Sequence, residues 1–370
     1  MSLFLLTKKT LAKTNPVNIL LLLRSSSSSS PVQPTPMAEY LINSCGFSPD
    51  AAARASKHIT HLTSSPKPDS VMHFLKHHSF TDPEIRTLVA NYPYILAADV
   101  DSLRPNLLSL SRIGFPEPYL RRVISLNPQS LQLSSAISRL EYWRSFLDGD
   151  MKKLSLAFTR NRGLINLDID KGVAPKIALL EAHGLSRTGI ATLVVRGHGF
   201  FRKSLASMED LLNRVEQLGF ARGSPGFLLG VSSFSGLGLD TLRAKLDIYK
   251  SFGWSEEELS SALRKFPFII RLSEDNIRAK MAFLVERAGC SQGYIALHPQ
   301  ILGYSLHKRL IPRHYVMKVR NELTGREWEL YAVMSVSEKK FMDRIILPLK
   351  DKLPMLLDTY TDACAGKITV

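Results

Sequence analysis

Arginine recurs at one position of a pattern that runs through most of the chain. Arg104, Arg139 and Arg243 each lie ten residues before a glycine, and Arg278 lies eleven before one. Each is next in sequence to an aliphatic residue, so in a helix its side chain would point about 100° away from a buried apolar line. Guanidinium groups along one wall suit phosphates, because neutralising a nucleic-acid backbone releases counterions. The pattern therefore predicts a nucleic-acid-binding stripe, although Arg is also a good helix former on any solvated face.

The stripe is interrupted in two units, where Ala174 and Glu209 stand in place of an Arg. We expect Lys176 and Arg214 to supply the contacts there. Arg313, in a basic segment near the C-terminus, completes the predicted set of nucleic-acid-binding residues.

The charge of the chain also indicates a polyanionic partner. The formal net charge is +15 at pH 7, and the sequence pI is about 9.7. Such a basic chain favours nucleic acid as its ligand. The competing explanation is an ordinary solvated basic surface.

Other kinds of chemistry have little support. Gly236-Leu237-Gly238 lacks the third glycine and the preceding strand of a dinucleotide fingerprint, and no Walker loop is found. His73 and His77 have a metal-compatible spacing, but no Glu or Cys completes a set of ligands. The three cysteines are far apart, which argues against a disulfide framework. We therefore expect no enzyme activity, no metal and no cofactor, and we expect aromatic residues such as Tyr92 and Phe266 to pack in the core.

The elements that would position these residues are clearest between residues 253 and 289. Ser255 and Glu258 form a capping-box pattern at the start of a helix. Its buried face should contain Leu259, Ala262, Leu263 and Phe266, and Pro267 should end it. A second helix should begin at Ser273 and end at Gly289.

This unit is repeated along the chain. The turn glycine recurs at spacings of 33 to 36 residues, and Ser79 takes its place once; the positions are Gly46, Ser79, Gly114, Gly149, Gly184, Gly219, Gly253 and Gly289. Ser or Thr follows two residues later in five units as a helix cap. Such a period predicts an all-α, right- or left-curving α-solenoid of about eight repeats of ~35 residues. The pattern is weakest between Gly149 and Val231, where we expect the least regular packing.

The repeat resembles that of the mitochondrial transcription termination factor (mTERF) family. The resemblance lies in a Gly-Phe turn, a capped helix and a Pro followed by an Ile/Leu pair, as in residues 113–128, 91–96 and 265–270. Residues 308–313 and 337–341 are similar to the closing segments of plant members. The resemblance implies a superhelical array and a role in organelle gene expression.

The chain is expected to have three parts. Residues 1–36 are basic, Ser-rich and Pro-rich, which is typical of a disordered organelle transit peptide. A mitochondrial destination is preferred to a chloroplast one, and a secretory signal is the competing interpretation. Residues 37–325 form the helical array, and residues 326–370 form a C-terminal capping segment and tail.

The function that the resemblance and the charge favour is binding of organellar double-stranded DNA through a basic groove, which would influence transcription termination or initiation. One alternative is RNA binding that supports intron splicing or rRNA maturation. The other is an α-solenoid scaffold for other proteins. We expect a monomer with no membrane association.

Overall fold

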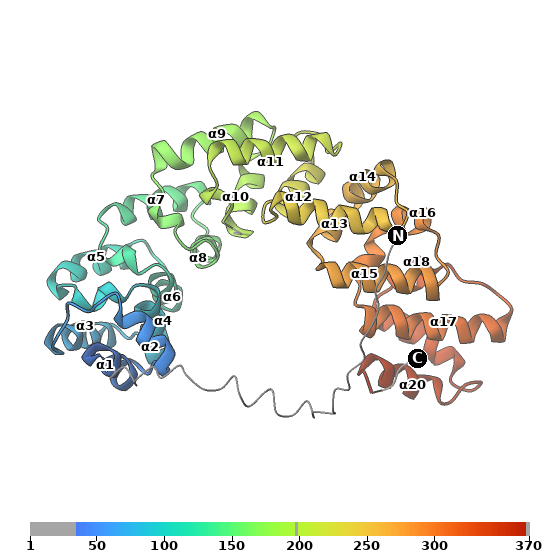
Figure 1. Ribbon diagram of the computed structural model, residues 1–370, viewed down its shortest axis with the longest axis horizontal. Coiled ribbons are helices and arrows are strands. Elements are labelled where there is room, and N and C mark those ends of the chain that lie inside the picture. The colour runs from blue at the N-terminus through green and yellow to red at the C-terminus, as the bar shows by residue number, and fades with distance from the viewer. Residues whose placement is uncertain (1–34, 197–198, 368–370) are drawn as a thin grey trace, which may run out of the picture.

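The chain folds into helical hairpins that follow one another along an open arch (Figure 1). The computed structural model describes residues 35–196 and 199–367, and these contain helices but no strand. Nine hairpins, each of a first and a second helix, make up the array: α1 (Pro36–Cys45) and α2 (Pro49–Ser56), α3 (Pro66–His77) and α4 (Asp82–Asn91), α5 (Val100–Arg112) and α6 (Glu117–Leu126), α7 (Ser135–Phe146) and α8 (Met151–Arg160), α9 (Ala174–Ala182) and α10 (Arg187–Arg196), α11 (Leu205–Gln217) and α12 (Pro225–Phe234), α13 (Leu239–Ser251) and α14 (Glu256–Lys265), α15 (Glu274–Ala282) and α16 (Gln292–Leu297), α17 (Ile311–Thr324) and α18 (Leu330–Ser335). The all-α repeat array predicted from the sequence is confirmed.

Each hairpin turns at the residue that the repeat predicted. All eight turn residues have positive φ, from 61° at Ser79 to 94° at Gly114. This left-handed backbone costs a residue with a Cβ about 1–2 kcal/mol, which is why glycine fills seven of the eight places. All five predicted caps also form, since the hydroxyls of Ser48, Thr81, Ser186, Ser255 and Ser291 accept backbone N–H groups.

The segments that follow the second helices have a recurring conformation. A short 3₁₀ turn usually joins a second helix to the next first helix: η2 (Pro93–Ala97), η3 (Pro128–Leu131), η4 (Leu164–Asn166), η6 (Phe200–Arg202), η7 (Pro267–Arg271) and η9 (Pro299–Gly303). The Ile and Leu side chains of these turns, such as Ile269 and Ile270, are buried. Phe266 corrects one prediction, because it lies just after α14 as its C-cap and is only half-buried, while Leu259, Ala262 and Leu263 are buried as expected.

The hairpins form two layers along the arch. Between α5 and α10, the first helices α5, α7 and α9 lie on the outside, and α6, α8 and α10 line the inside (Figure 1). A continuous core runs from Met37 to Met334. Three first helices are preceded or followed by a π-helical turn: η5 (Ile169–Val173), η8 (Phe283–Arg287) and η10 (Leu306–Leu310).

The hairpin of α11 and α12 departs most from the repeat. Its turn residue Gly219 and its Ser224 cap are normal, but α12 ends in a plain turn without a 3₁₀ segment. Small residues let it pack closely: a Cβ on Gly230 would lie 2.9 Å from a methyl of Val215. The hydroxyls of Ser232 and Ser233 are buried, and neither has a hydrogen-bond partner among the described residues.

The C-terminal segment adds a further hairpin and a second core. Gly325 has φ 62° and lies 36 residues after Gly289, so α17 and α18 repeat the unit once more. The boundary expected at 325/326 falls inside this hairpin. Val316, Val333, Phe341 and other residues build a separate small core with α19 (Glu338–Phe341), η11 (Met342–Ile346), η12 (Leu347–Leu349) and α20 (Leu356–Cys364). Almost all of the expected transit peptide, residues 1–34, lies outside the described residues.

Candidate nucleic-acid interface

Three of the predicted arginines are exposed. Arg104, Arg243 and Arg278 follow the buried residues Leu103, Leu242 and Ile277, and point away from the core. Each is the fifth residue of its first helix, so it lies about 6 Å along the axis from the helix start. The Arg104 guanidinium lies 5.7 Å from the centroid of the Phe74 ring on α3. Arg243 and Arg278 belong to successive hairpins, whereas Arg104 belongs to a hairpin much earlier in the array.

The other four predicted residues bond to the protein itself. Nη1 of Arg139 donates to the carbonyl of Ile165 (2.8 Å), and Nζ of Lys176 donates to that of Phe201 (2.6 Å). Nε of the half-buried Arg214 donates to the Asp210 carbonyl one turn earlier (3.1 Å). Lys176 and Arg313 are buried, and their charged groups face the interior. The seven residues therefore do not form one stripe.

Arg139 and Lys176 belong to a set that we name the staple residues. Each is a polar residue of a first helix whose side chain donates to a carbonyl at the end of the same hairpin's second helix or following turn. The donor and acceptor pairs are Asn106 and Leu131 (2.8 Å), Arg139 and Ile165 (2.8 Å), Lys176 and Phe201 (2.6 Å), Lys245 and Ile270 (3.0 Å), Lys280 and Leu302 (2.7 Å), Arg313 and Val333 (3.0 Å). A helix end leaves carbonyls without partners, and an unpaired buried carbonyl costs about 1–3 kcal/mol. The staples supply the missing donors.

The staple pattern explains why Arg139 does not lie with the exposed arginines and why lysines are buried in the array. Every staple lies three residues after a buried apolar residue: Leu103, Ala136, Val173, Leu242, Ile277 and Leu310. Arg139 thus has the register of the staples and not that of Arg104, which lies one residue after Leu103. Burial lowers the pKa of Lys176, Lys245 and Lys280. The recurring pattern apolar-x-x-polar is the sequence signal of the set, but it does not show which distant carbonyl the polar group reaches.

Arg313 is the most enclosed staple. Its guanidinium donates to the carbonyls of Val333 and Val336 and to the Glu338 carboxylate (2.8 Å), and it lies 4.3 Å from the centroid of the Phe341 ring. Burial raises the pKa of Glu338, but hydrogen bonds from Arg313 and Tyr360 outweigh this and hold it below its usual value. This group joins the last hairpin to the C-terminal core, so contact with a ligand would require breaking it.

A second set of side chains joins successive hairpins. Asn91, Asn127 and Asn161, at or just after the ends of second helices, donate to carbonyls near the end of the next second helix, those of Ser125, Phe158 and Val194 (3.1, 3.0 and 2.6 Å). Lys265 donates in the same way to Leu297 (3.2 Å). We name these the ladder bonds. They fix how each hairpin sits on its neighbour.

The topology gives the array two long edges. The glycine edge consists of the glycine-containing connections between the two helices of each hairpin. The turn edge consists of the connections between successive hairpins, where the 3₁₀ turns lie. Each edge is taken to include the adjoining four residues of the helices on either side. Basic residues outnumber acidic ones on the turn edge even when the buried staples Lys176 and Arg313 are left out: Arg54, Lys57, Lys67, Arg160, Arg162, Lys171, Arg196, Arg202, Lys203, Arg264, Lys265, Arg271, Lys308, Arg309, Lys339 and Lys340 against Asp69, Asp99, Asp101, Asp168, Asp170, Asp240, Glu274, Asp275 and Glu338. Acidic residues outnumber basic ones on the glycine edge, where second helices begin and carboxylates favour the helix dipole.

A solvent-open hollow of about 460 Å³ lies on the turn edge. Its lining includes Asn91, Gln129, Arg162, Asn166 and Arg202, which come from four successive hairpins. Arg162 and Arg202 are exposed, and Nη1 of Arg162 donates to the Asn91 amide oxygen (3.2 Å). The hollow therefore offers two guanidinium groups among amide side chains, which together suit an anionic and hydrogen-bonding ligand.

Comparison with known families agrees with this architecture. The mTERF family model matches residues 72–194 and 151–342, which together cover most of the chain. This chain belongs to the mTERF family. The matched residues begin within α3 and end in the C-terminal segment, so they include most of the hairpins described above. They also include Arg162 and Arg202 of the turn edge.

Two curated mTERF proteins of Arabidopsis thaliana are similar to the chain. It is 20% identical over 260 residues to transcription termination factor MTERF8, chloroplastic, covering 69% of this chain and 51% of that protein. It is 22% identical over 279 residues to transcription termination factor MTERF15, mitochondrial, covering 74% of this chain and 54% of that protein. The chain thus spans about half the length of these relatives. Both are organellar proteins, which supports the organellar location expected from the sequence.

Among residues 35–196 and 199–367, no group of three or more His, Cys, Asp or Glu side chains is placed to hold a metal ion. No helix within those ranges is long and apolar enough to cross a bilayer.

Proposed function

We propose that this mTERF protein binds organellar nucleic acid along its turn edge and so regulates organelle gene expression. Double-stranded DNA is the proposed ligand, and transcription termination or initiation is the proposed step. The observation that supports this most is the pair of exposed arginines in the turn-edge hollow, Arg162 and Arg202, within an edge where basic residues predominate. The names of the two relatives support the assignment to transcription.

The repeat distance suits a phosphate backbone. Packed helices lie about 8–10 Å apart, so each hairpin advances the array by roughly the length of three base pairs. A basic residue contributed by successive hairpins can then meet every third phosphate or so. Arg104, Arg243 and Arg278 lie one turn inside the first helices, which begin at the same edge, and extend this proposed path.

The salt dependence of binding tests the proposal. The full chain should be titrated against duplex DNA, single-stranded RNA and a DNA–RNA heteroduplex at several salt concentrations. The triple variant Arg162→Gln, Arg196→Gln, Arg202→Gln should reduce the slope of log affinity against log salt by about 2–3, since each lost phosphate contact is worth about 0.9. Tightest binding to RNA would favour a role in splicing or rRNA maturation, and no binding to any of the three would favour a protein scaffold.

A matched control removes the same charge from the other edge. Arg112, Arg144 and Lys152 are exposed on the glycine edge. Their combined replacement by Gln should leave the slope unchanged, because these side chains do not face the proposed path. Equal effects of the two triple variants would mean that general charge, and not the turn edge, determines binding. A third variant, Arg104→Gln, Arg243→Gln, Arg278→Gln, measures how far the path extends along the first helices.

The destination within the cell is proposed to be the mitochondrion, with the chloroplast as the alternative. One relative is named as mitochondrial and the other as chloroplastic. The full chain fused to a fluorescent protein should co-localise with a mitochondrial marker in plant cells, whereas co-localisation with chlorophyll would select the alternative.

A further inference from the structure

An aromatic hollow lies at the N-terminal end of the turn edge. It has a volume of about 320 Å³ and lies between α2 and the turn η2. Phe47 and Ala55 form an apolar floor, while Tyr92, Tyr94 and His58 supply rings and Arg54 supplies a cation. The volume is at the small end of the range for small-molecule sites.

The rings are arranged as an open surface and not as a closed core. Tyr94 is 45% exposed, although it directly follows the buried Pro93. Its ring centroid lies 5.8 Å from that of His58 and 5.6 Å from that of Tyr92, at interplanar angles of 64° and 54°. These neighbours fix the orientation of the Tyr94 ring through edge contacts, which leaves ring surface accessible from solvent.

This position differs from its counterparts in the array. The residue after the turn proline is Gln129 in η3 and Gln300 in η9, and it is the half-buried Phe268 in η7. Phe268 makes an edge contact with Phe266 at 5.4 Å. Among these four residues that follow a turn proline, Tyr94 therefore combines an aromatic ring with exposure beside a hollow.

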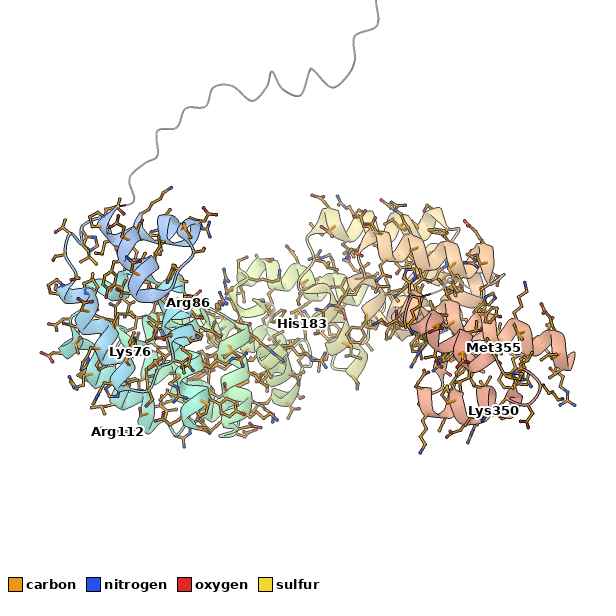
Figure 2. The ribbon with its side chains drawn as sticks, turned by 90° about the horizontal axis from the view of Figure 1, so that it is seen from below. Lys76, Arg86, Arg112, His183, Lys350 and Met355 are labelled. Atoms are coloured by element: carbon orange, nitrogen blue, oxygen red, sulfur yellow. The ribbon has the colours of Figure 1, made fainter. Side chains whose placement is uncertain are left out.

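The aromatic hollow adjoins the basic one. Asn91 lines both hollows, and its amide oxygen accepts a hydrogen bond from Arg162. Asn91 is the last residue of α4, and Figure 2 shows Arg86 of the same helix on the N-terminal arm of the arch, the arm that also carries Lys76 and Arg112. A strand whose phosphates pass Arg162 and Arg202 would thus lead toward Tyr94 at the end of the edge.

We propose that the aromatic hollow binds an unpaired nucleobase of a single-stranded extension, while the adjoining duplex lies on the turn edge. The inference rests on the proposed function. The Tyr94 ring would stack on the base, because every base has a π face and such stacking tolerates any sequence. Arg54 is placed to contact the phosphate of the same nucleotide, and the Asn91 and His58 side chains offer hydrogen-bonding groups at the rim.

The test compares three DNA ligands that share one duplex. The first is blunt, the second has a three-nucleotide single-stranded overhang, and the third has the same overhang without its bases. Overhangs of both polarities are used, and RNA overhangs form a parallel series. The full chain should bind the overhang about 5- to 150-fold more tightly than the blunt duplex, and the abasic overhang should lose most of that gain.

Two variants assign the gain to the ring. Tyr94→Ala should abolish it, and Tyr94→Phe should retain it, because the phenyl ring still stacks. Neither change should alter the salt slope measured with the blunt duplex, since that ligand does not reach the Tyr94 ring. 2-Aminopurine placed in the overhang should be quenched by the wild-type chain and by Tyr94→Phe, and should remain bright with Tyr94→Ala.

The possible failures can be told apart. Equal affinity for the intact and abasic overhangs, with normal binding of the blunt duplex, would overturn the base pocket and leave the proposed function standing. An unchanged overhang gain in Tyr94→Ala would also overturn it. If the blunt duplex does not bind at any salt concentration, the proposed function fails, whereas Tyr94-dependent binding of isolated single strands would still support the pocket.

Discussion

The hairpins α13–α14 and α11–α12 are neighbours in sequence, and they show what each part of the repeat contributes. In α13–α14, a capping box at Ser255 starts the second helix, Pro267 begins a 3₁₀ turn, and Lys245 staples that turn. In α11–α12 the turn is absent, and the staple position, three residues after the buried Met208, holds the apolar Leu211. Both hairpins nevertheless keep the left-handed glycine and the helix cap.

The difference separates two tasks. The glycine and the cap set the length and direction of a hairpin, since they are retained where the rest of the pattern is lost. The 3₁₀ turn and its staple secure the hairpin end. They occur together in five hairpins, and neither is found in α11–α12; η2 forms without a staple among the described residues, and Arg313 staples the last hairpin without a 3₁₀ turn. We therefore expect α11–α12 to be the least stable part of the array, and three measurements test this.

The largest effect is expected at the staple. Lys245→Ala should lower the free energy of unfolding by about 2–3 kcal/mol, because the Ile270 carbonyl loses its donor and the buried stem leaves a cavity. Chemical denaturation measures the change. Lys245→Arg should restore part of it, as Arg139 fills the same role on α7. The exposed Lys250 on the same helix is the control, and its replacement by Ala should have little effect; a similar loss at both lysines would remove the staple from the explanation.

The next effect is a difference in local opening. Native-state hydrogen exchange should show the amides of α12 opening at least tenfold more often than those of α14, a difference of about 1.4 kcal/mol. The reason is that α12 lacks the stapled turn that closes α14. Equal protection of the two helices would show that packing alone stabilises the hairpins.

The smallest effect has opposite signs in the two hairpins. Ser255→Ala should destabilise the chain by about 1 kcal/mol, because the first turn of α14 loses its cap. Ser233→Ala should stabilise it by about 0.5–1 kcal/mol, because the buried hydroxyl has no partner among the described residues. Thermal melts of the two variants give the signs directly, and destabilisation by both would contradict the unpaired state of Ser233.

The success of sequence reasoning followed the range of the interactions. Turn glycines, the unusual Ser79 and all five caps depend on backbone a few residues away, so their spacing predicted them. The staples depend on a carbonyl 20–26 residues further along the chain, so Lys245 was not predicted and Arg139 was predicted to be a phosphate contact. Gly325 was missed because α18 lacks the Pro and Ile/Leu signals that marked the other hairpins.

The sequence predicted the class of ligand for the candidate interface but not the residues that form it. The excess of positive charge indicated an anionic ligand, but the predicted residues proved to be a mixture of exposed arginines and buried staples. Arg162 and Arg202 lie in different hairpins, 40 residues apart in sequence, and only the stacking of turns brings them to one hollow. No local pattern distinguishes them from other basic residues at helix ends.

The ladder bonds have a mechanical consequence. They connect the second helices from α4 to α10, and again α14 to the end of α16, whereas among the described residues no such bond joins α12 to α10 or to α14. When elements are loaded in series, the most compliant one takes up most of the strain. On one side, Arg264 of α14 still reaches the α11–α12 hairpin, because it donates to the Leu218 carbonyl (3.1 Å). A change in the curvature of the arch should therefore be concentrated between α10 and α12, with the segments on either side moving as two stiff arms.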